Sequence, residues 1–169
     1  MTILQRNKAI LMDATKQLLR MSNPLHLLAT GFGSGLSPVM PGTIGSLAAI
    51  PFWLLLITLP WKLHLLLVTC SICIGIYLCH NTAKDIKAHD HSSIVWDEFV
   101  GMWITLMALP INNWQWVITG LVIFRILDIG KPWPIRWLDH NVRGGIGIMI
   151  DDIVTGILSA NIIYLISKY

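Results

Sequence analysis

Charged residues are scarce in this sequence. They make up 12% of its 169 residues, against 54% hydrophobic residues and a mean hydropathy of +0.65, whereas soluble domains carry about 25% charged residues. This scarcity excludes an ordinary soluble domain and predicts an integral membrane protein in contact with a lipid bilayer. The net charge is only +3, and the basic residues are spread among the expected loops, so the sequence gives no support to nucleic-acid binding.

Cysteine and an N-terminal apolar core are also lacking. The three cysteines, Cys70, Cys73 and Cys79, lie in one apolar run with no second ligand pair after them, which favours buried apolar side chains over a zinc or redox site. The first 22 residues hold no long apolar run, so we expect no cleavable signal peptide. Residues 1–22 instead mix apolar residues with four basic ones. They fit either a basic amphipathic helix on an anionic membrane surface or a solvated basic tail.

Five apolar runs are present, separated by polar or turn-forming residues. Each is shorter than the ~20 residues that a straight membrane span needs. The sequence therefore predicts one all-α domain over residues 1–169, a multi-helical membrane protein with about five short apolar helices. Asn23-Pro24 predicts a further helix start, and residues 81–95 and 128–149 are expected to be polar connections. The apolar runs are Ser46–Leu59, Leu63–Cys79, Phe99–Leu109, Trp114–Leu127 and Ile153–Ile166.

The positions of the basic residues predict an orientation in the membrane. With a cytoplasmic N-terminus and five crossings, the basic connections 81–95 and 128–149 both fall on the cytoplasmic side. The turns at 60–62 and 110–113 then fall outside, in agreement with the positive-inside tendency. The same arrangement gathers the acids of the second half of the chain at the cytoplasmic face, together with the glycine-rich segment 31–45.

The few acids are concentrated in sequence. Only nine exist, six of them lie between Asp97 and Asp152, and four of the six form the adjacent pairs Asp97-Glu98 and Asp151-Asp152. Each pair is expected at the start of an apolar helix, where an acid stabilises the first turn by ~0.3–1 kcal/mol. Such capping accounts for one acid at the start of a helix, but it accounts less well for an adjacent pair of acids at two different helices. An ionised carboxylate near lipid is also costly to desolvate. With Asp128, the pairs predict a Mg²⁺ site. All five acids are candidate metal ligands, and Asp97, Glu98, Asp128 and Asp152 are candidate catalytic residues that activate a water molecule.

Two groups of residues are candidates for binding a phosphate ester. The segment 31–45 holds five glycines and two prolines, so its backbone N–H groups can approach an anion closely. Its spacing matches neither a Walker A loop nor a dinucleotide fingerprint, and a purely structural turn remains an alternative. Arg125 and Lys131 are the cations near Asp128, although Arg125 is also placed to pair with Asp128 at i, i+3. The candidate phosphate-binding residues are Gly33, Ser34, Gly35, Ser37, Arg125 and Lys131.

Four long strings of the sequence resemble a known family. They are GFGSGLSPVMPGTIGSLAAIPFW at 31–53, IVWDEFVGMWITLMALP at 94–110, FRILDIGKPWPIRWLD at 124–139 and GGIGIMIDDIVTG at 144–156. Together they resemble phosphatidylglycerophosphatase A, a family of membrane lipid phosphatases, over nearly the whole chain. The resemblance implies a Mg²⁺-dependent phosphomonoesterase of the bacterial inner membrane that converts phosphatidylglycerophosphate into phosphatidylglycerol and phosphate.

Other phosphatase classes lack support, because no Cys-x5-Arg loop and no DxDx[TV] string occurs. The roles of individual residues rest on the spacing of the acids and cations, and we expect the site to face the cytoplasm. Two other classes of protein stay open. A small divalent-cation transporter or channel would carry acids along a path or at both faces, and a non-catalytic scaffold would need none of them. The sequence predicts no oligomeric state.

Overall fold

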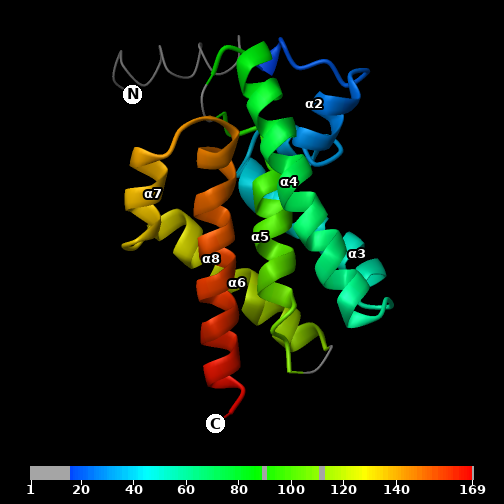
Figure 1. Ribbon diagram of the computed structural model, residues 1–169, viewed down its shortest axis with the longest axis vertical. Helices are drawn as coiled ribbons and strands as arrows, with labels where there is room; N and C mark the ends of the chain where they lie inside the picture. Colours follow the sequence, from blue (N-terminus) through cyan, green and yellow to red (C-terminus); the bar gives the residue numbers. More distant parts are fainter. Residues whose placement is uncertain (1–15, 89–90, 111–112, 169) are drawn as a thin grey trace.

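The computed structural model describes residues 16–88, 91–110 and 113–168. Within these ranges the regular secondary structure is entirely helical (Figure 1), so the all-α prediction is confirmed for the described residues. Most of the expected N-terminal amphipathic segment lies outside them. The helices are α2 (Pro24–Ala29), η1 (Ser34–Leu36), α3 (Pro41–Leu56), α4 (Trp61–Asp85), α5 (Trp96–Leu106), α6 (Trp114–Gly130), α7 (Ile135–Asn141) and α8 (Gly144–Ile166).

The short helix α5 is the centre of the bundle, and all but two of its 11 residues are buried. It packs against α8, α3, α4 and α6, and Figure 1 shows it enclosed between α8 and the pair α3 and α4. Trp103 ties it to α3, because its Nε1 donates to the carbonyl of Ala49 at 2.9 Å. The crossing with α8 is close: a β-carbon on Gly156 would lie 2.6 Å from the carbonyl oxygen of Gly101. Small residues at this crossing therefore let the two backbones touch.

The helices α4 and α8 extend further than the sequence predicted. Helix α4 continues to Asp85, into the expected connection 81–95, and α8 begins at Gly144 rather than near Ile153. The prediction of a polar connection through residue 149 is wrong, because the glycines there serve packing within a helix. A β-carbon on Gly145 would overlap the carbonyl of Ile76 on α4. By contrast, the expected helix start at Asn23-Pro24 is confirmed, since the Asn23 side chain accepts from the N–H of Leu25.

Among the described residues, two helices, α4 and α8, are long and apolar enough to cross a membrane by length and composition. Only 28% of the apolar window of α4 is buried inside the protein, so most of that helix presents apolar side chains outward. Leu55 on α3, Leu66 on α4 and Ile126 on α6 are among many exposed large apolar residues, and such surface is costly in water. These features support an integral membrane protein. Five crossings stay a prediction, because α5 is only roughly 16 Å long.

Candidate active site

Three carboxylates meet where α5 crosses α8. One side-chain oxygen from each of Asp97, Glu98 and Asp152 lies within 4.8 Å of the others. Asp97 and Glu98 stand in the first turn of α5, whereas Asp152 lies about two turns inside α8. Asp97 is 8% exposed and Asp152 is 3% exposed. The tight contact between Gly101 and α8 brings these side chains together from positions that are far apart in sequence.

The three carboxylates keep oxygens that no described residue satisfies. Asp97 Oδ1, Glu98 Oε2 and Asp152 Oδ1 are all buried without a hydrogen-bond partner among the described residues. Buried polar atoms are nearly always paired, and ionised carboxylates this close together repel one another. A divalent cation that takes oxygen ligands fits this arrangement. Capping does not account for Asp152, because a residue two turns inside a helix is beyond the unsatisfied N–H groups.

A cation borders the carboxylate cluster on the side of α6. Arg125 Nη1 lies 2.7 Å from Asp128 Oδ2 and 3.9 Å from Glu98 Oε1, and it also approaches Ser46 Oγ at 3.5 Å. Asp128 in turn lies beside Asp152, close enough for a side-chain hydrogen bond. The expected i, i+3 pairing of Arg125 with Asp128 is therefore present. Arg125 keeps a buried Nε with no described partner, so it retains capacity to bind an anion.

Asp151 and Lys131 belong to a different group of charges. Lys131 Nζ lies 2.9 Å from Asp151 Oδ2 and 2.7 Å from Asp139 Oδ1. Adjacent residues on a helix point about 100° apart, so Asp151 faces this lysine while Asp152 faces the cluster. Burial by itself lowers the pKa of Lys131, but the hydrogen bonds to Asp139 and Asp151 outweigh it and raise that pKa above its ordinary range. Lys131 therefore stays protonated and joins α6, α7 and α8.

Replacing Lys131 by methionine is expected to lower the free energy of unfolding by about 1–3 kcal/mol. The loss comes from two partly buried carboxylates left without their shared cation, less than for a fully buried pair because these groups keep some contact with solvent. Thermal unfolding in detergent, without phosphate or metal, measures it. Arg136→Met, at an exposed basic residue of α7, is the matched control. Equal melting temperatures for the two variants would contradict a structural role for Lys131.

The glycine-rich segment lies against the residues that precede α5. A β-carbon on Gly35 would overlap the carbonyl oxygen of Ser93. The hydroxyls serve local turns: Ser34 Oγ donates to the Thr30 carbonyl at 3.4 Å, and Ser37 Oγ donates to the Val39 carbonyl at 2.9 Å. The contacts of Ser34, Gly35 and Ser37 thus fit the alternative that this segment is a structural turn. Phosphate binding by Gly33, Ser34, Gly35 and Ser37 stays a prediction.

The first turn of α3 supplies site residues that the sequence reasoning missed. Gly42 lies so close that a β-carbon there would overlap Glu98 Oε1 and stand 3.1 Å from both Nη atoms of Arg125. Thr43 Oγ1 in the same turn is buried with no hydrogen-bond partner in the described part of the chain. Residues 42–45 were expected in a loop. Pro41 was the available signal, because proline favours the first position of a helix, and α3 does begin there.

The family model described as phosphatidylglycerophosphatase A matches residues 27–167. The chain belongs to the phosphatidylglycerophosphatase A family. This confirms the resemblance seen in the sequence, and the match covers every residue of the carboxylate cluster.

Two relatives extend the similarity. Phosphatidylglycerophosphatase A of Escherichia coli (strain K12) is 68% identical over 169 residues, which are 100% of this chain and 96% of the relative. Phosphatidylglycerophosphatase A of Haemophilus influenzae (strain ATCC 51907 / DSM 11121 / KW20 / Rd) is 45% identical over 148 residues, which are 87% of this chain and 91% of the relative. No solved structure matches the chain.

Proposed function

We propose that the protein is a lipid phosphatase that hydrolyses the terminal phosphomonoester of phosphatidylglycerophosphate to phosphatidylglycerol and phosphate. The observation that carries this proposal is the group of three close carboxylates beside Arg125, two of them buried and Glu98 partly buried, each with a buried oxygen that no described residue satisfies. The names of the relatives supply the substrate. The cluster supplies the chemistry, because phosphate esters are commonly hydrolysed where carboxylates hold a divalent cation.

The residues Asp97, Glu98 and Asp152 would hold the metal, and Mg²⁺ is our proposal for it. Mg²⁺ prefers oxygen ligands and is commonly bound by one or two carboxylates together with substrate phosphate oxygens. When bound, such an ion polarises a phosphoryl oxygen and lowers the pKa of a water molecule. Asp151 was also a candidate ligand, but its contact with Lys131 directs it away from the cluster. Asp128, the fifth candidate, lies outside the group of three and pairs with Arg125, so we propose three ligands rather than five.

The remaining site residues bind the phosphate and move a proton. Arg125 donates to the phosphate oxygens, since a guanidinium matches them with two parallel hydrogen bonds. The missing side chain of Gly42 lets Glu98 and Arg125 approach the N-terminus of α3, where backbone N–H groups favour an anion. Asp128, beside both Arg125 and Asp152, accepts the proton of the attacking water. A new oxygen–phosphorus bond forms, the ester bond breaks, and the leaving glycerol oxygen takes up a proton.

We also propose that the protein passes several times through the bacterial inner membrane with the cluster at the cytoplasmic face. The two candidate spans and the exposed apolar side chains support membrane insertion. The basic residues near the cluster support the orientation, because loops rich in lysine and arginine stay cytoplasmic.

A divalent-cation transporter or channel was one of the two other classes of protein left open by the sequence. A transport path would distribute acids along the bundle or at both ends. In the described structure Asp97, Glu98 and Asp152 instead gather at one crossing, with Asp128 beside them. This arrangement favours the phosphatase.

The proposal is tested by phosphate release from phosphatidylglycerophosphate by the purified protein in detergent. We expect release with Mg²⁺, release near background in EDTA, and recovery when Mg²⁺ is added in excess. Absence of release with every divalent cation tried would refute the proposed function. Undiminished release in EDTA would refute the metal site while leaving the lipid phosphatase intact. Phosphate release from phosphatidic acid, measured in the same way, shows whether the enzyme selects its substrate by the headgroup.

Alanine at Gly42 is expected to reduce phosphate release about tenfold or more at nearly unchanged melting temperature. The added methyl group must displace Glu98 and Arg125 inside the site, whereas it leaves the helical backbone of α3 in place. The matched control is Gly130→Ala, because a β-carbon there meets nothing within 4 Å. Equal activity of the two variants would show that the site has room at residue 42.

A further inference from the structure

The substrate of the proposed reaction carries a second charge that Arg125 and a metal in the carboxylate cluster do not neutralise. Phosphatidylglycerophosphate has a phosphodiester between its two glycerols, in addition to the terminal phosphate that is hydrolysed. A phosphate group is bound most strongly by a cationic side chain that donates hydrogen bonds to it. An enzyme that holds both ends of this headgroup therefore needs a further cation near the site.

The described cations differ in whether carboxylates already neutralise them. Arg125 is paired with Asp128, and Lys131 is paired with Asp151. Lys16 has no carboxylate within ion-pair distance in the described part of the chain, and its Nζ donates instead to the carbonyl of a neutral residue, Leu36. An ammonium group has three N–H donors. Lys16 therefore keeps two donors and an uncompensated charge for an anion.

The bond to Leu36 places Lys16 on the side of the carboxylate cluster. A β-carbon on Gly35, the neighbour of Leu36, would lie 3.0 Å from Val95 Cγ1. Val95 stands directly before α5, two residues from Asp97. Two residues span at most ~7 Å, so these contacts together put the ammonium of Lys16 on the order of 10–15 Å from the cluster.

The headgroup of the substrate has a matching length. One glycerol joins its two phosphorus atoms, and this bridge is about as long as two extended residues, or ~7 Å. A contact of roughly 3 Å at each end adds to this length. A lipid whose terminal phosphate lies at the cluster thus reaches a cation roughly 13 Å away, which is within the range of Lys16.

The chain that follows Leu36 is suited to contact with lipid. Val39 is 67% exposed and Met40 is 57% exposed, and both lie between Leu36 and the first turn of α3. Exposed apolar side chains beside an unpaired cation are typical of the boundary between lipid tails and headgroups. A phosphodiester lies at this level of a bilayer.

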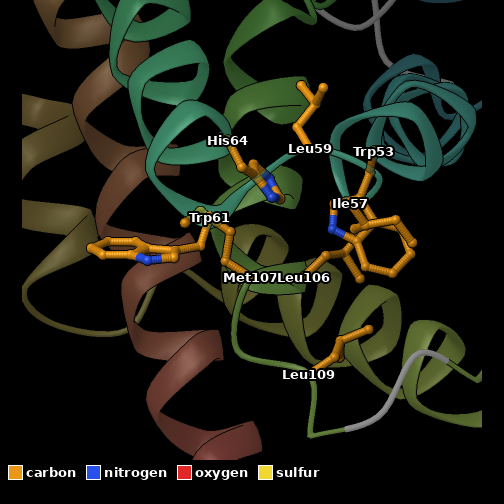
Figure 2. A pocket seen from close by; sticks show the side chains of 8 residues that line it. All are labelled: Trp53, Ile57, Leu59, Trp61, His64, Leu106, Met107 and Leu109. Atoms are coloured by element: carbon orange, nitrogen blue, oxygen red, sulfur yellow. The ribbon is translucent and has the colours of Figure 1, made fainter.

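Other regions of the described structure fit the second phosphate less well. The exposed cations Lys84 and Arg136 have neither an ion pair nor a side-chain hydrogen bond there, so no contact fixes their position. The cavity in Figure 2 is lined by eight residues, none of them lysine or arginine. Its lining includes Leu106, which is nine residues or roughly 14 Å along α5 from Asp97. These comparisons favour Lys16.

Granted the lipid phosphatase proposed above, we propose that Lys16 binds the phosphodiester of phosphatidylglycerophosphate. Its ammonium donates to the unesterified oxygens of the phosphodiester, while the terminal phosphate lies at Arg125 and the carboxylate cluster. A lipid with a single phosphate lacks this contact. Lys16 therefore determines specificity for the headgroup and takes no part in the bond-breaking step.

Kinetics of the full-length protein in mixed micelles of detergent and lipid test the proposal. In Lys16→Met we expect kcat/KM for phosphatidylglycerophosphate to fall about tenfold, because a hydrogen bond to a charged group is lost. The inhibition constant of phosphatidylglycerol, which keeps the phosphodiester but lacks the terminal phosphate, should rise by about the same factor. The inhibition constant of inorganic phosphate should stay unchanged, which also shows that the active site is folded. Lys84→Met removes the same charge from an exposed residue of α4 and should change none of the three constants.

Two outcomes would overturn the role of Lys16 alone. One is an unchanged kcat/KM in Lys16→Met, and the other is an equal rise in the inhibition constants of phosphatidylglycerol and inorganic phosphate. A wild type that releases no phosphate from phosphatidylglycerophosphate would overturn the proposed function as well.

Two further variants separate the charge of Lys16 from its contact with Leu36. Lys16→Gln can still donate to the Leu36 carbonyl but carries no charge, so it should show the same losses as Lys16→Met and replaces that variant if it does not fold. Lys16→Arg keeps the charge and should retain most of the activity. Wild-type kinetics in Lys16→Gln would assign Lys16 to holding the loop and overturn the proposal.

Discussion

Asparagine at Asp152 should reduce phosphate release by about 100-fold or more, and in EDTA it should make the protein more stable. The activity falls because the variant loses one of three proposed ligands of the cation, whose contribution to the transition state is several kcal/mol. The stability rises because Asp152 is buried within 4.8 Å of two other carboxylates. Removing one negative charge relieves repulsion and desolvation, by about 1–3 kcal/mol in the metal-free protein.

Both effects can be measured on the same preparations. Phosphate release gives the activity, and thermal unfolding in EDTA and in excess Mg²⁺ gives the stability. We expect Mg²⁺ to raise the melting temperature of the wild type and to have little effect on the variant, because a ligand stabilises only the state that binds it. Asp139→Asn is the control, since it removes an acid that lies outside the cluster. A variant that Mg²⁺ stabilises as much as the wild type would exclude Asp152 as a ligand.

Methionine at Arg125 should lower kcat/KM about 10- to 100-fold, because a hydrogen bond to a charged group contributes about 1.5–3 kcal/mol. The loss should appear in kcat as well as KM if Arg125 binds the phosphate more tightly as charge develops on it. Arg125→Lys keeps the charge but loses the two-pronged geometry, so its activity should lie between those of the wild type and Arg125→Met.

Arg125 also faces Asp128 and Glu98, so a purely structural role must be separated from phosphate binding. Inorganic phosphate serves for this purpose as a competitive inhibitor. The inhibition constant should rise in Arg125→Met by about the same factor as kcat/KM falls, whereas Arg136→Met should leave it unchanged. An unchanged inhibition constant in Arg125→Met would assign Arg125 to positioning Asp128 alone.

The sequence was sufficient for much of the fold and for the choice of the acids. Apolar runs predicted helices where α3, α4, α5, α6 and α8 lie, because a chain exposed to lipid must satisfy its backbone within each segment. Acids are so rare in this chain that Asp97, Glu98 and Asp152 stood out before any contact was known. The pairing of Arg125 with Asp128 was also readable, since residues three apart on a helix are neighbours whatever surrounds them.

The tertiary structure decided which member of each group reaches the site. Asp151 and Asp152 are equivalent in sequence, and only the packing of α8 against α5 turns Asp152 toward the cluster and Asp151 toward Lys131. The start of α8 at Gly144 was hidden because glycines read as turn formers, while here they allow contact with the backbone of α4. The approach of Gly42 to Glu98 and Arg125 depends on three helices at once. Local patterns determine where helices form, but the rotation and contact of one helix against another depend on side chains that are distant in sequence, and these contacts built the site.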